Sequence, residues 1–282
     1  GIYSLAFGVL FGGLLQIFFL FPFVKRVLGQ KSLEFSYRPV FNFTSATNKR
    51  YYSQLWPISI DVLISKISEL VDLFIASGLA TGVISVLYYA KTIFRLPFAI
   101  ISQGINTVIL KEFSEKIALF DKDKAKRLFV DGIKTNVFLL LPISIMMFLL
   151  ADQIVSVLLE RFSFTPLAVI HTAAALKAYS LGLVGWGVSS LTTRIFSARI
   201  DIKTSMILNT CMITVNVMLC FYLVNTELGF IGLALATSIS YILFSIIRIV
   251  VLKYKLKNEQ IIVRSHEFLK SISKSFLSAL IM

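Results

Sequence analysis

Long apolar runs separated by short charged segments place the strongest limit on the fold of this chain. A helix needs about 20 apolar residues to cross the hydrocarbon core of a membrane. The chain is 57% hydrophobic and 15% charged, whereas about 25% of the residues in a soluble domain are charged. The sequence therefore predicts a membrane protein with about eight spans. The predicted spans are residues 3–24, 54–78, 83–110, 132–151, 166–193, 205–224, 229–252 and 266–282.

We predict that all of these spans are α-helices. Backbone N–H and C=O groups find no water inside a bilayer, so only helices and closed barrels cross it. The alternation of apolar and polar residues that a membrane barrel requires is not found in the sequence. The predicted fold class is therefore an all-α polytopic membrane protein.

Lysine and arginine residues are concentrated in every second loop. The loops at 25–50, 111–127 and 253–264 hold most of them, whereas those at 79–82 and 225–229 hold none. Basic loops remain on the cytoplasmic side of a membrane, so these three loops are predicted to be cytoplasmic. The net charge of +13 is thus spread between apolar runs, which favours contact with a lipid surface and not with nucleic acid.

The sequence carries no motif of a common enzyme class. It has no HExxH metalloprotease motif, no GxSxG nucleophile elbow and no Walker phosphate-binding loop. Its two cysteines, Cys211 and Cys220, would lie roughly 13 Å apart along one helix, which is too far for a disulfide. We predict that the protein is not an enzyme.

Several polar residues lie inside the third predicted span. Ionisable side chains at membrane depth are costly and usually mark a functional site. On a helical projection these residues fall within about 60° of one direction, which predicts a polar stripe along a hydrated cavity. Thr92 lies beside the stripe, and Pro97 interrupts the helical hydrogen bonds near mid-span. The stripe consists of Tyr88, Lys91, Arg95, Ser102 and Asn106.

The two cations of this stripe repel each other unless an opposite charge lies nearby. One interpretation of Lys91 and Arg95 is a binding site for an anionic ligand. The other is ion pairing with the acidic residues of the second span, Asp61, Glu69 and Asp72. The two interpretations can coexist, because carboxylates can hold an empty basic site in place.

A further lysine, Lys177, lies well inside the fifth predicted span. Two positions stay open for it. It either faces the same cavity as the stripe, or extends its ammonium group to the membrane surface.

Five short segments occur in an order that is characteristic of a known family. They are LYYAKTIFRLP (87–97), LLERFSFTP (158–166), AYSLGLVG (178–185), FSARIDIKTS (196–205) and GLALATSIS (232–240). They resemble motifs of the MurJ/MviN lipid II flippases, within the multidrug/oligosaccharidyl-lipid/polysaccharide exporter superfamily. The most specific is FSARIDIKTS, which is similar to FYARxDxKTP in the family. The resemblance extends over most of residues 52–245.

The resemblance implies a two-lobed protein around a central cavity, of which this chain is the C-terminal portion. Because the chain begins and ends inside apolar runs, we interpret it as a piece of a longer protein. The implied domains are the last helix of the N-terminal lobe (1–24), a cytoplasmic amphipathic linker (25–50), a C-terminal transmembrane lobe of six helices (51–256) and the start of an additional helix (257–282).

The function that the resemblance implies is the flipping of lipid II by alternating access. Lipid II is the undecaprenyl-pyrophosphate-linked peptidoglycan precursor, so the implied role lies in cell-wall biogenesis and cell shape. The implied location is the bacterial inner membrane, where a multi-pass protein would also contact membrane lipids.

The resemblance also implies two kinds of site. Basic cavity residues of the family hold the pyrophosphate, a role that falls on Lys91 and Arg95, while the usual family arginine is replaced by Thr92. The full predicted substrate-binding set is Tyr88, Lys91, Thr92, Arg95, Ser102, Asn106 and Lys177. Some members bind a sodium ion, and the matching residues here are Asp72, Asn216 and Thr237, with Cys220 in place of a further carboxylate.

Three other functions stay open from the sequence. They are flipping of another polyprenyl-linked glycan such as O-antigen, a non-transporting scaffold for cell-wall enzymes, and cation-coupled drug export. The segments at 158–166 and 196–205 favour lipid II over O-antigen. A scaffold has no need to bury Lys91 and Arg95, and a cation-coupled drug exporter predicts an acidic cavity where this stripe is basic.

Overall fold

The computed structural model describes residues 7–8, 10–16, 18–20, 22, 46–119, 121–160, 164–199, 201–258, 273–274 and 277. The chain divides into two compact units, residues 1–51 and residues 52–282. In the first unit, residues 10–16 and 18–20 are helical, at the place of the first predicted span. Most of the predicted linker at 25–50 and of the last predicted span at 266–282 lies outside the described residues.

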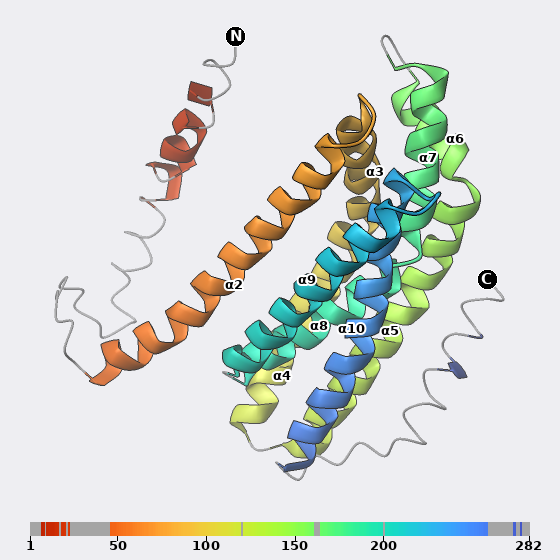
Figure 1. Ribbon diagram of the computed structural model, residues 1–282. Helices are drawn as coiled ribbons and strands as arrows, with labels where there is room; N and C mark the ends of the chain where they lie inside the picture. Colours follow the sequence, from red (N-terminus) through yellow and green to blue (C-terminus); the bar gives the residue numbers. More distant parts are fainter. Residues whose placement is uncertain are drawn as a thin grey trace. The chain divides into compact units, whose positions relative to one another are not determined.

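The described part of the second unit is helical and contains no strand (Figure 1). This confirms the predicted all-α class. The helices are α2 (Ala46–Ser77), α3 (Val83–Pro97), the π-helix η1 (Phe98–Ser102), α4 (Gln103–Ala118), α5 (Lys122–Leu149), α6 (Ala151–Leu159), α7 (Pro166–Ser180), α8 (Leu183–Ala198), α9 (Ile202–Val224) and α10 (Phe230–Asn258).

Among the described residues, four helices are long and apolar enough to cross a membrane, and five if the bent pair α7–α8 counts as one span. They are the continuous helix Val83–Ala118, α5, α9, α10 and the pair α7–α8, which bends by 48°. These correspond to five of the predicted spans. The predicted span at 54–78 forms part of α2 and is interrupted by four charged residues, Asp61, Lys66, Glu69 and Asp72.

The break predicted at Pro97 is found in the structure as a change of helix type. Proline has no backbone N–H and cannot continue the α-helical hydrogen bonds. Directly after Pro97 the chain forms the five-residue π-helix η1 before it returns to α-helix in α4. A π turn bonds residue i to residue i+5. Side chains after η1 therefore point in other directions than a pure α-helical projection predicts.

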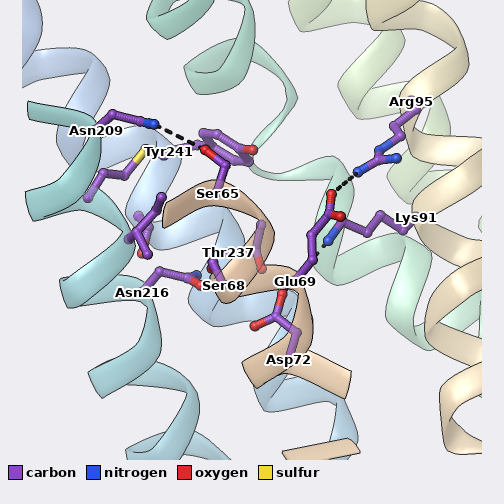
Figure 2. A pocket seen from close by; sticks show the side chains of 13 residues that line it. Ser65, Ser68, Glu69, Asp72, Lys91, Arg95, Asn209, Asn216, Thr237 and Tyr241 are labelled. Carbon is purple, nitrogen blue, oxygen red and sulfur yellow. Dashed lines mark hydrogen bonds and ion pairs between the residues drawn. The ribbon is translucent and has the colours of Figure 1, made fainter. Parts of the chain in front are cut away.

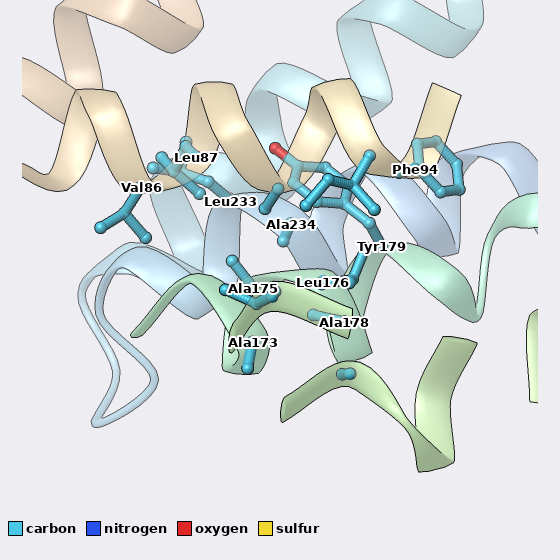
Figure 3. Close-up of a cluster of buried hydrophobic side chains, with 14 of the residues drawn as sticks. Val86, Leu87, Phe94, Ala173, Ala175, Leu176, Ala178, Tyr179, Leu233 and Ala234 are labelled. Atoms are coloured by element: carbon cyan, nitrogen blue, oxygen red, sulfur yellow. The ribbon is translucent and has the colours of Figure 1, made fainter. Parts of the chain in front are cut away.

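The core of the lobe lies where α3, α7 and α10 meet (Figure 3). Alanines on α7 and α10 let these helices approach closely, as small residues do between membrane helices. Aromatic rings fill the remaining space: Phe94 of α3 stacks on Tyr179 of α7 with ring centroids 5.6 Å apart, and on Trp186 of α8 at 5.2 Å. The buried face of α3 packs against this core.

The backbone of α8 contacts that of α10 at Gly185. A Cβ atom on Gly185 would lie 2.8 Å from the Ile242 backbone nitrogen and 2.9 Å from the Tyr241 carbonyl oxygen. These are backbone atoms, so they cannot move aside as a side chain can. We expect Gly185→Ala to lower the free energy of unfolding by about 1–3 kcal/mol, because the two helices must separate. Thermal unfolding of the purified protein measures this effect.

The matched control is Gly104→Ala, because a Cβ atom on Gly104 has no neighbouring atom within 4 Å. Alanine also has a higher helix propensity than glycine. We expect Gly104→Ala to leave the melting temperature unchanged or to raise it slightly. Equal losses in the two variants would contradict the close approach of α8 and α10.

Candidate functional site

Two ion pairs connect α3 to α2. Lys91 Nζ lies 3.8 Å from Asp72 Oδ2, and Arg95 Nη2 lies 3.7 Å from Glu69 Oε1. Figure 2 shows the two basic side chains of α3 directed toward the two carboxylates of α2. The predicted pairing of Lys91 and Arg95 with acids of the second span is therefore confirmed for Glu69 and Asp72.

Both pairs are loose and partly open to the surroundings. Distances of 3.7 and 3.8 Å exceed the 2.7–2.9 Å or so of a charge-assisted hydrogen bond. Glu69 also accepts a hydrogen bond from Lys66 at 2.9 Å, as its i,i+3 spacing predicts. The Arg95 side chain is 52% exposed and that of Lys91 is 30% exposed. An exposed pair such as Arg95–Glu69 stabilises a fold by only about 0–1 kcal/mol.

The charged residues stand between two cavities of different chemistry. Glu69, Asp72, Lys91 and Arg95 line both of them. One cavity, of about 170 Å³, extends between α2, α9 and α10. Its walls are rich in hydroxyl and amide groups, namely those of Ser65, Ser68, Asn209, Asn216, Thr237, Ser240 and Tyr241. We call it the polar cavity.

The second cavity, of about 240 Å³, extends between α2 and α3 toward the core. Apart from the four charged residues its walls are aliphatic and aromatic, namely Leu73, Ala76, Ile84, Leu87, Tyr88, Tyr179 and Leu233. We call it the apolar cavity. The lobe thus presents two cations at the boundary between a polar and an apolar space.

Two other predicted site residues are close to the cations. Tyr88 lines the apolar cavity. Thr92 is exposed, and its hydroxyl donates a hydrogen bond to the Tyr88 carbonyl oxygen at 2.8 Å. Thr92 is not among the residues that line either cavity. Thr92 stands at the position where the resemblance implies an arginine, so Lys91 and Arg95 are the cations of this segment.

The structure does not place Ser102 and Asn106 with Lys91 and Arg95, which corrects the prediction of one continuous stripe. Both side chains are fully buried. Ser102 donates a hydrogen bond to Asn136 Oδ1 at 2.8 Å, and Asn136 in turn donates to Asn106 Oδ1 at 3.1 Å. The physical reason is η1, because its π turn rotates all later residues relative to those before Pro97.

Lys177 also lies away from the two cavities. Its ammonium group pairs with Asp152 Oδ2 of α6 at 2.6 Å, and Lys177 lines neither cavity. Of the two positions left open by the sequence, a place beside Lys91 and Arg95 is therefore wrong for this structure.

The three residues matched to a sodium site all line the polar cavity. Asp72, Asn216 and Thr237 contribute a carboxylate, an amide and a hydroxyl from α2, α9 and α10. The Thr237 hydroxyl donates to the Leu233 carbonyl at 3.0 Å, so its lone pairs can face the cavity. These are the oxygen donors that hard cations prefer. The donor set fits such an ion in kind.

One neighbour fits such an ion less well. The Cys220 thiol lies 3.9 Å from Asn216 Oδ1 and 4.0 Å from Asp72 Oδ1. Sulfur is a soft ligand that hard cations do not favour. In the part of the chain that the structure describes, no group of three or more His, Cys, Asp or Glu residues could hold a metal ion. A transition-metal site is therefore not supported there.

A hydrogen-bond network that was not predicted from the sequence begins at Arg248 of α10. This arginine is only 2% exposed. It donates hydrogen bonds to Thr193 of α8 and, at 3.3 Å, to Asn209 Oδ1 of α9. Asn209 donates to Asp61 Oδ1 of α2 at 2.7 Å. Asp61 therefore contacts Asn209 and takes no part in the ion pairs of Lys91 and Arg95. The position of an arginine within an apolar run was the feature of the sequence that could have indicated this network.

We expect Arg248→Met to lower the free energy of unfolding by about 2–3 kcal/mol, the contribution of hydrogen bonds to a charged group. Methionine fills similar space but leaves Thr193 and Asn209 without their donor. Thermal unfolding of Arg248→Met, Asn209→Ala and the double variant measures the coupling. The double variant should lose less than the sum of the single losses. Additive losses of unfolding free energy would contradict a connected hydrogen-bond network.

The most specific motif has a structural role at the start of α9. Asp201 precedes this helix, accepts a hydrogen bond from Thr204 Oγ1 at 2.8 Å and pairs with Lys255 of α10. Partial burial tends to raise the pKa of Asp201, but the hydrogen bonds from Lys255 and Thr204 outweigh it and lower the pKa below its usual value. FSARIDIKTS therefore connects the start of α9 to α10, and none of its described residues lines either cavity.

Comparison with known proteins identifies the family of the chain. The family model described as lipid II flippase MurJ matches residues 1–282. The chain is 30% identical over 247 residues to a probable lipid II flippase MurJ of Borreliella burgdorferi, covering 88% of this chain and 47% of the relative. It is 31% identical over 242 residues to a probable lipid II flippase MurJ of Vibrio cholerae, covering 84% and 44%. The chain thus spans about half the length of these curated relatives.

Solved structures show the same fold. A structure of lipid II flippase MurJ in an inward closed conformation superposes with a TM-score of 0.68 at 25% identity, covering 88% of this chain and 50% of that protein. A multidrug resistance MATE family transporter in an outward-facing conformation superposes with a TM-score of 0.64 at 19% identity, covering 79% and 51%. The second likeness shows a common fold only. The match of the family model over the full chain decides between the two: the chain belongs to the MurJ family of lipid II flippases.

Proposed function

We propose that this chain is the C-terminal half of a lipid II flippase of the bacterial inner membrane, and that Lys91 and Arg95 hold the substrate pyrophosphate. The observation that carries the proposal is the position of these two cations between a polar and an apolar cavity, with only loose carboxylate partners. The relatives named probable lipid II flippase support lipid II over O-antigen as the substrate.

The two cations are suited to different parts of a pyrophosphate. The Arg95 guanidinium can donate two parallel hydrogen bonds to the oxygens of one phosphate, while Lys91 supplies a compact point charge. A pyrophosphate brings more negative charge than one carboxylate, so it displaces Glu69 from Arg95 and Asp72 from Lys91. Substrate binding thus breaks the two ion pairs that connect α2 to α3. A ligand that favours one arrangement of the helices shifts the protein toward it, and alternating access requires such a shift.

Asp72, Asn216 and Thr237 would hold a sodium ion if the flippase uses one, and the ion would supply positive charge beside Asp72. The carboxylate at Asp72 faces both Lys91 and the polar cavity. This residue therefore stands between the proposed pyrophosphate site and the proposed ion site. No catalytic step is part of this proposal, since flipping forms and breaks no covalent bond.

Transport by the full-length protein tests the proposed function directly. The protein is reconstituted in lipid vesicles with fluorescent lipid II or with a fluorescent polyprenyl-pyrophosphate-linked O-antigen unit, and the inward-to-outward movement of each is followed. We expect movement of lipid II only. Movement of the O-antigen unit at an equal rate would favour the broader glycan flippase, and movement of neither would favour the scaffold.

The orientation of the chain gives a separate prediction. The segment around Lys122, at the start of α5, is basic, whereas the turn at Thr226 carries no lysine or arginine. A single cysteine at Lys122 should resist an impermeant thiol reagent in intact cells, and one at Thr226 should react. A cysteine at Ser32, which lies outside the described residues, should resist as well. Labelling at Lys122 and Ser32 alone would reverse the orientation.

A further inference from the structure

The order of chemical environments along the lobe matches the order of groups in a lipid-linked pyrophosphate. Such a molecule consists of an apolar chain, then the pyrophosphate, then a sugar. Lys91 and Arg95 line both the apolar cavity and the polar cavity, and Figure 2 shows the lining of the polar one. A ligand anchored on these two cations therefore has an apolar and a polar space within reach of its two ends.

The apolar cavity has the depth and size to take part of a chain. Leu87 and Leu233 at its wall are buried, whereas Ile84 at its mouth is 41% exposed. A dry cavity of about 150 Å³ holds one benzene molecule. By the same measure the 240 Å³ of this cavity admits roughly ten carbon atoms. That is the length of two isoprenoid units, and the rest of a longer chain would leave through the mouth into the bilayer.

We propose, on the basis of the proposed function, that the apolar cavity between α2 and α3 binds the two isoprenoid units next to the pyrophosphate of the substrate. A soluble polyanion such as a nucleotide has no apolar end to place there. An ordinary phospholipid has an apolar end, but it carries a glycerol backbone between phosphate and chain, which separates the two by several bonds. Lys91 is itself part of the lining of the apolar cavity, so a phosphate bound there lies directly beside the apolar space, which favours a chain attached directly to phosphate.

The test compares two soluble probes on the full-length protein: inorganic pyrophosphate and geranyl pyrophosphate, which carries a ten-carbon isoprenoid chain. Isothermal titration gives a dissociation constant for each, and the ratio of the two constants isolates the chain. We expect geranyl pyrophosphate to bind at least about 10-fold more tightly, because several apolar carbons leave water.

A matched pair of substitutions locates the chain. Ile84→Trp places a large ring at the mouth of the apolar cavity, whereas Ile100→Trp places the same ring on η1 at a residue that is 76% exposed and lines neither cavity. We expect Ile84→Trp to reduce the ratio of the two constants to about 1–2, and Ile100→Trp to leave it unchanged. A uniform loss of affinity for both probes does not alter the ratio and so is not mistaken for blockage.

Several outcomes would overturn the inference. If pyrophosphate binds through Lys91 and Arg95 but the geranyl chain adds nothing, the inference fails while the proposed anchor stands. The inference also fails if the chain adds affinity that Ile84→Trp and Ile100→Trp change equally. Equal competition by dihexanoyl phosphatidylglycerol would show a general lipid crevice instead. If the binding of both probes is independent of Lys91 and Arg95, the proposed pyrophosphate anchor is wrong, and the inference is wrong with it.

Discussion

Alanine at Arg95 in the full-length flippase is expected to reduce lipid II translocation by about 100-fold or more, and alanine at Lys91 to have a similar effect. Loss of a forked, charge-assisted pair with phosphate removes about 3 kcal/mol of binding, and each 1.4 kcal/mol or so is tenfold in affinity. Complementation of cells depleted of their own flippase measures the effect in vivo, and vesicle transport measures it in vitro.

Two controls separate the charge from the shape of the site. Arg95→Lys keeps the positive charge but loses the fork, so it should retain partial transport. Lys66→Ala removes an exposed cation that pairs with Glu69 but lines neither cavity, and it should transport almost normally. Full complementation by Arg95→Ala and Lys91→Ala would contradict the anchor. Loss of the protein from the membrane in these variants would instead assign them a structural role.

The second large effect is expected at Asp72. If the polar cavity holds sodium, Asp72→Asn should abolish the rise in melting temperature that sodium produces, because it removes the charged oxygen donor. A ligand at ten times its dissociation constant stabilises a protein by about 1.4 kcal/mol, which a thermal shift readily detects. Potassium of equal concentration corrects for ionic strength.

Two further variants sharpen the result. Asp152→Asn changes a carboxylate that pairs with Lys177 of α7 and lines neither cavity, so it should keep the sodium effect. Cys220→Asp replaces a thiol next to Asp72 and Asn216 by an oxygen donor, so it should strengthen sodium binding. An undiminished sodium effect in Asp72→Asn would remove the ion site from this cavity.

The central part of the site was predictable from the sequence because its cause is local. Lys91 and Arg95 are one helical turn apart in an apolar run, and charged groups in such a run need a partner or a hydrated space. Asp61 and Asp72 of α2 lie at a spacing that puts them on one helix face, with Glu69 to one side of it. From these two facts, pairing with acids of the second span was one of two interpretations of Lys91 and Arg95, and the structure contains such pairs with Asp72 and Glu69.

The positions of Ser102 and Asn106 were not predictable in the same way. Pro97 indicated a break, but proline alone does not reveal whether the chain bends or forms a π turn. The π-helix η1 changes the direction of every later side chain. A projection at a constant angle was therefore correct before Pro97 and wrong after it.

Contacts between distant parts of the chain were also beyond the sequence. The apolar cavity is completed by Tyr179 of α7 and Leu233 of α10, which follow α3 by many residues. Lys177 of α7 meets Asp152 of α6, a contact between two separate helices that the sequence does not specify. Arg248 differs from these cases, because its place in an apolar run was visible and only its partners were not.

The polar face of α2 sets a condition for any motion of this helix. Its contacts with α3 and α9 include the ion pairs at Glu69 and Asp72 and the hydrogen bond at Asp61, while Leu63, Leu70 and Phe74 are exposed. If α2 left the lobe in a dry bilayer, Asp61 and Asp72 would lose these partners and Glu69 would keep only Lys66 of its own helix, which is strongly unfavourable. The helix can move only when water or ligand follows it into the gap. A dry gap therefore holds α2 against α3 and α9.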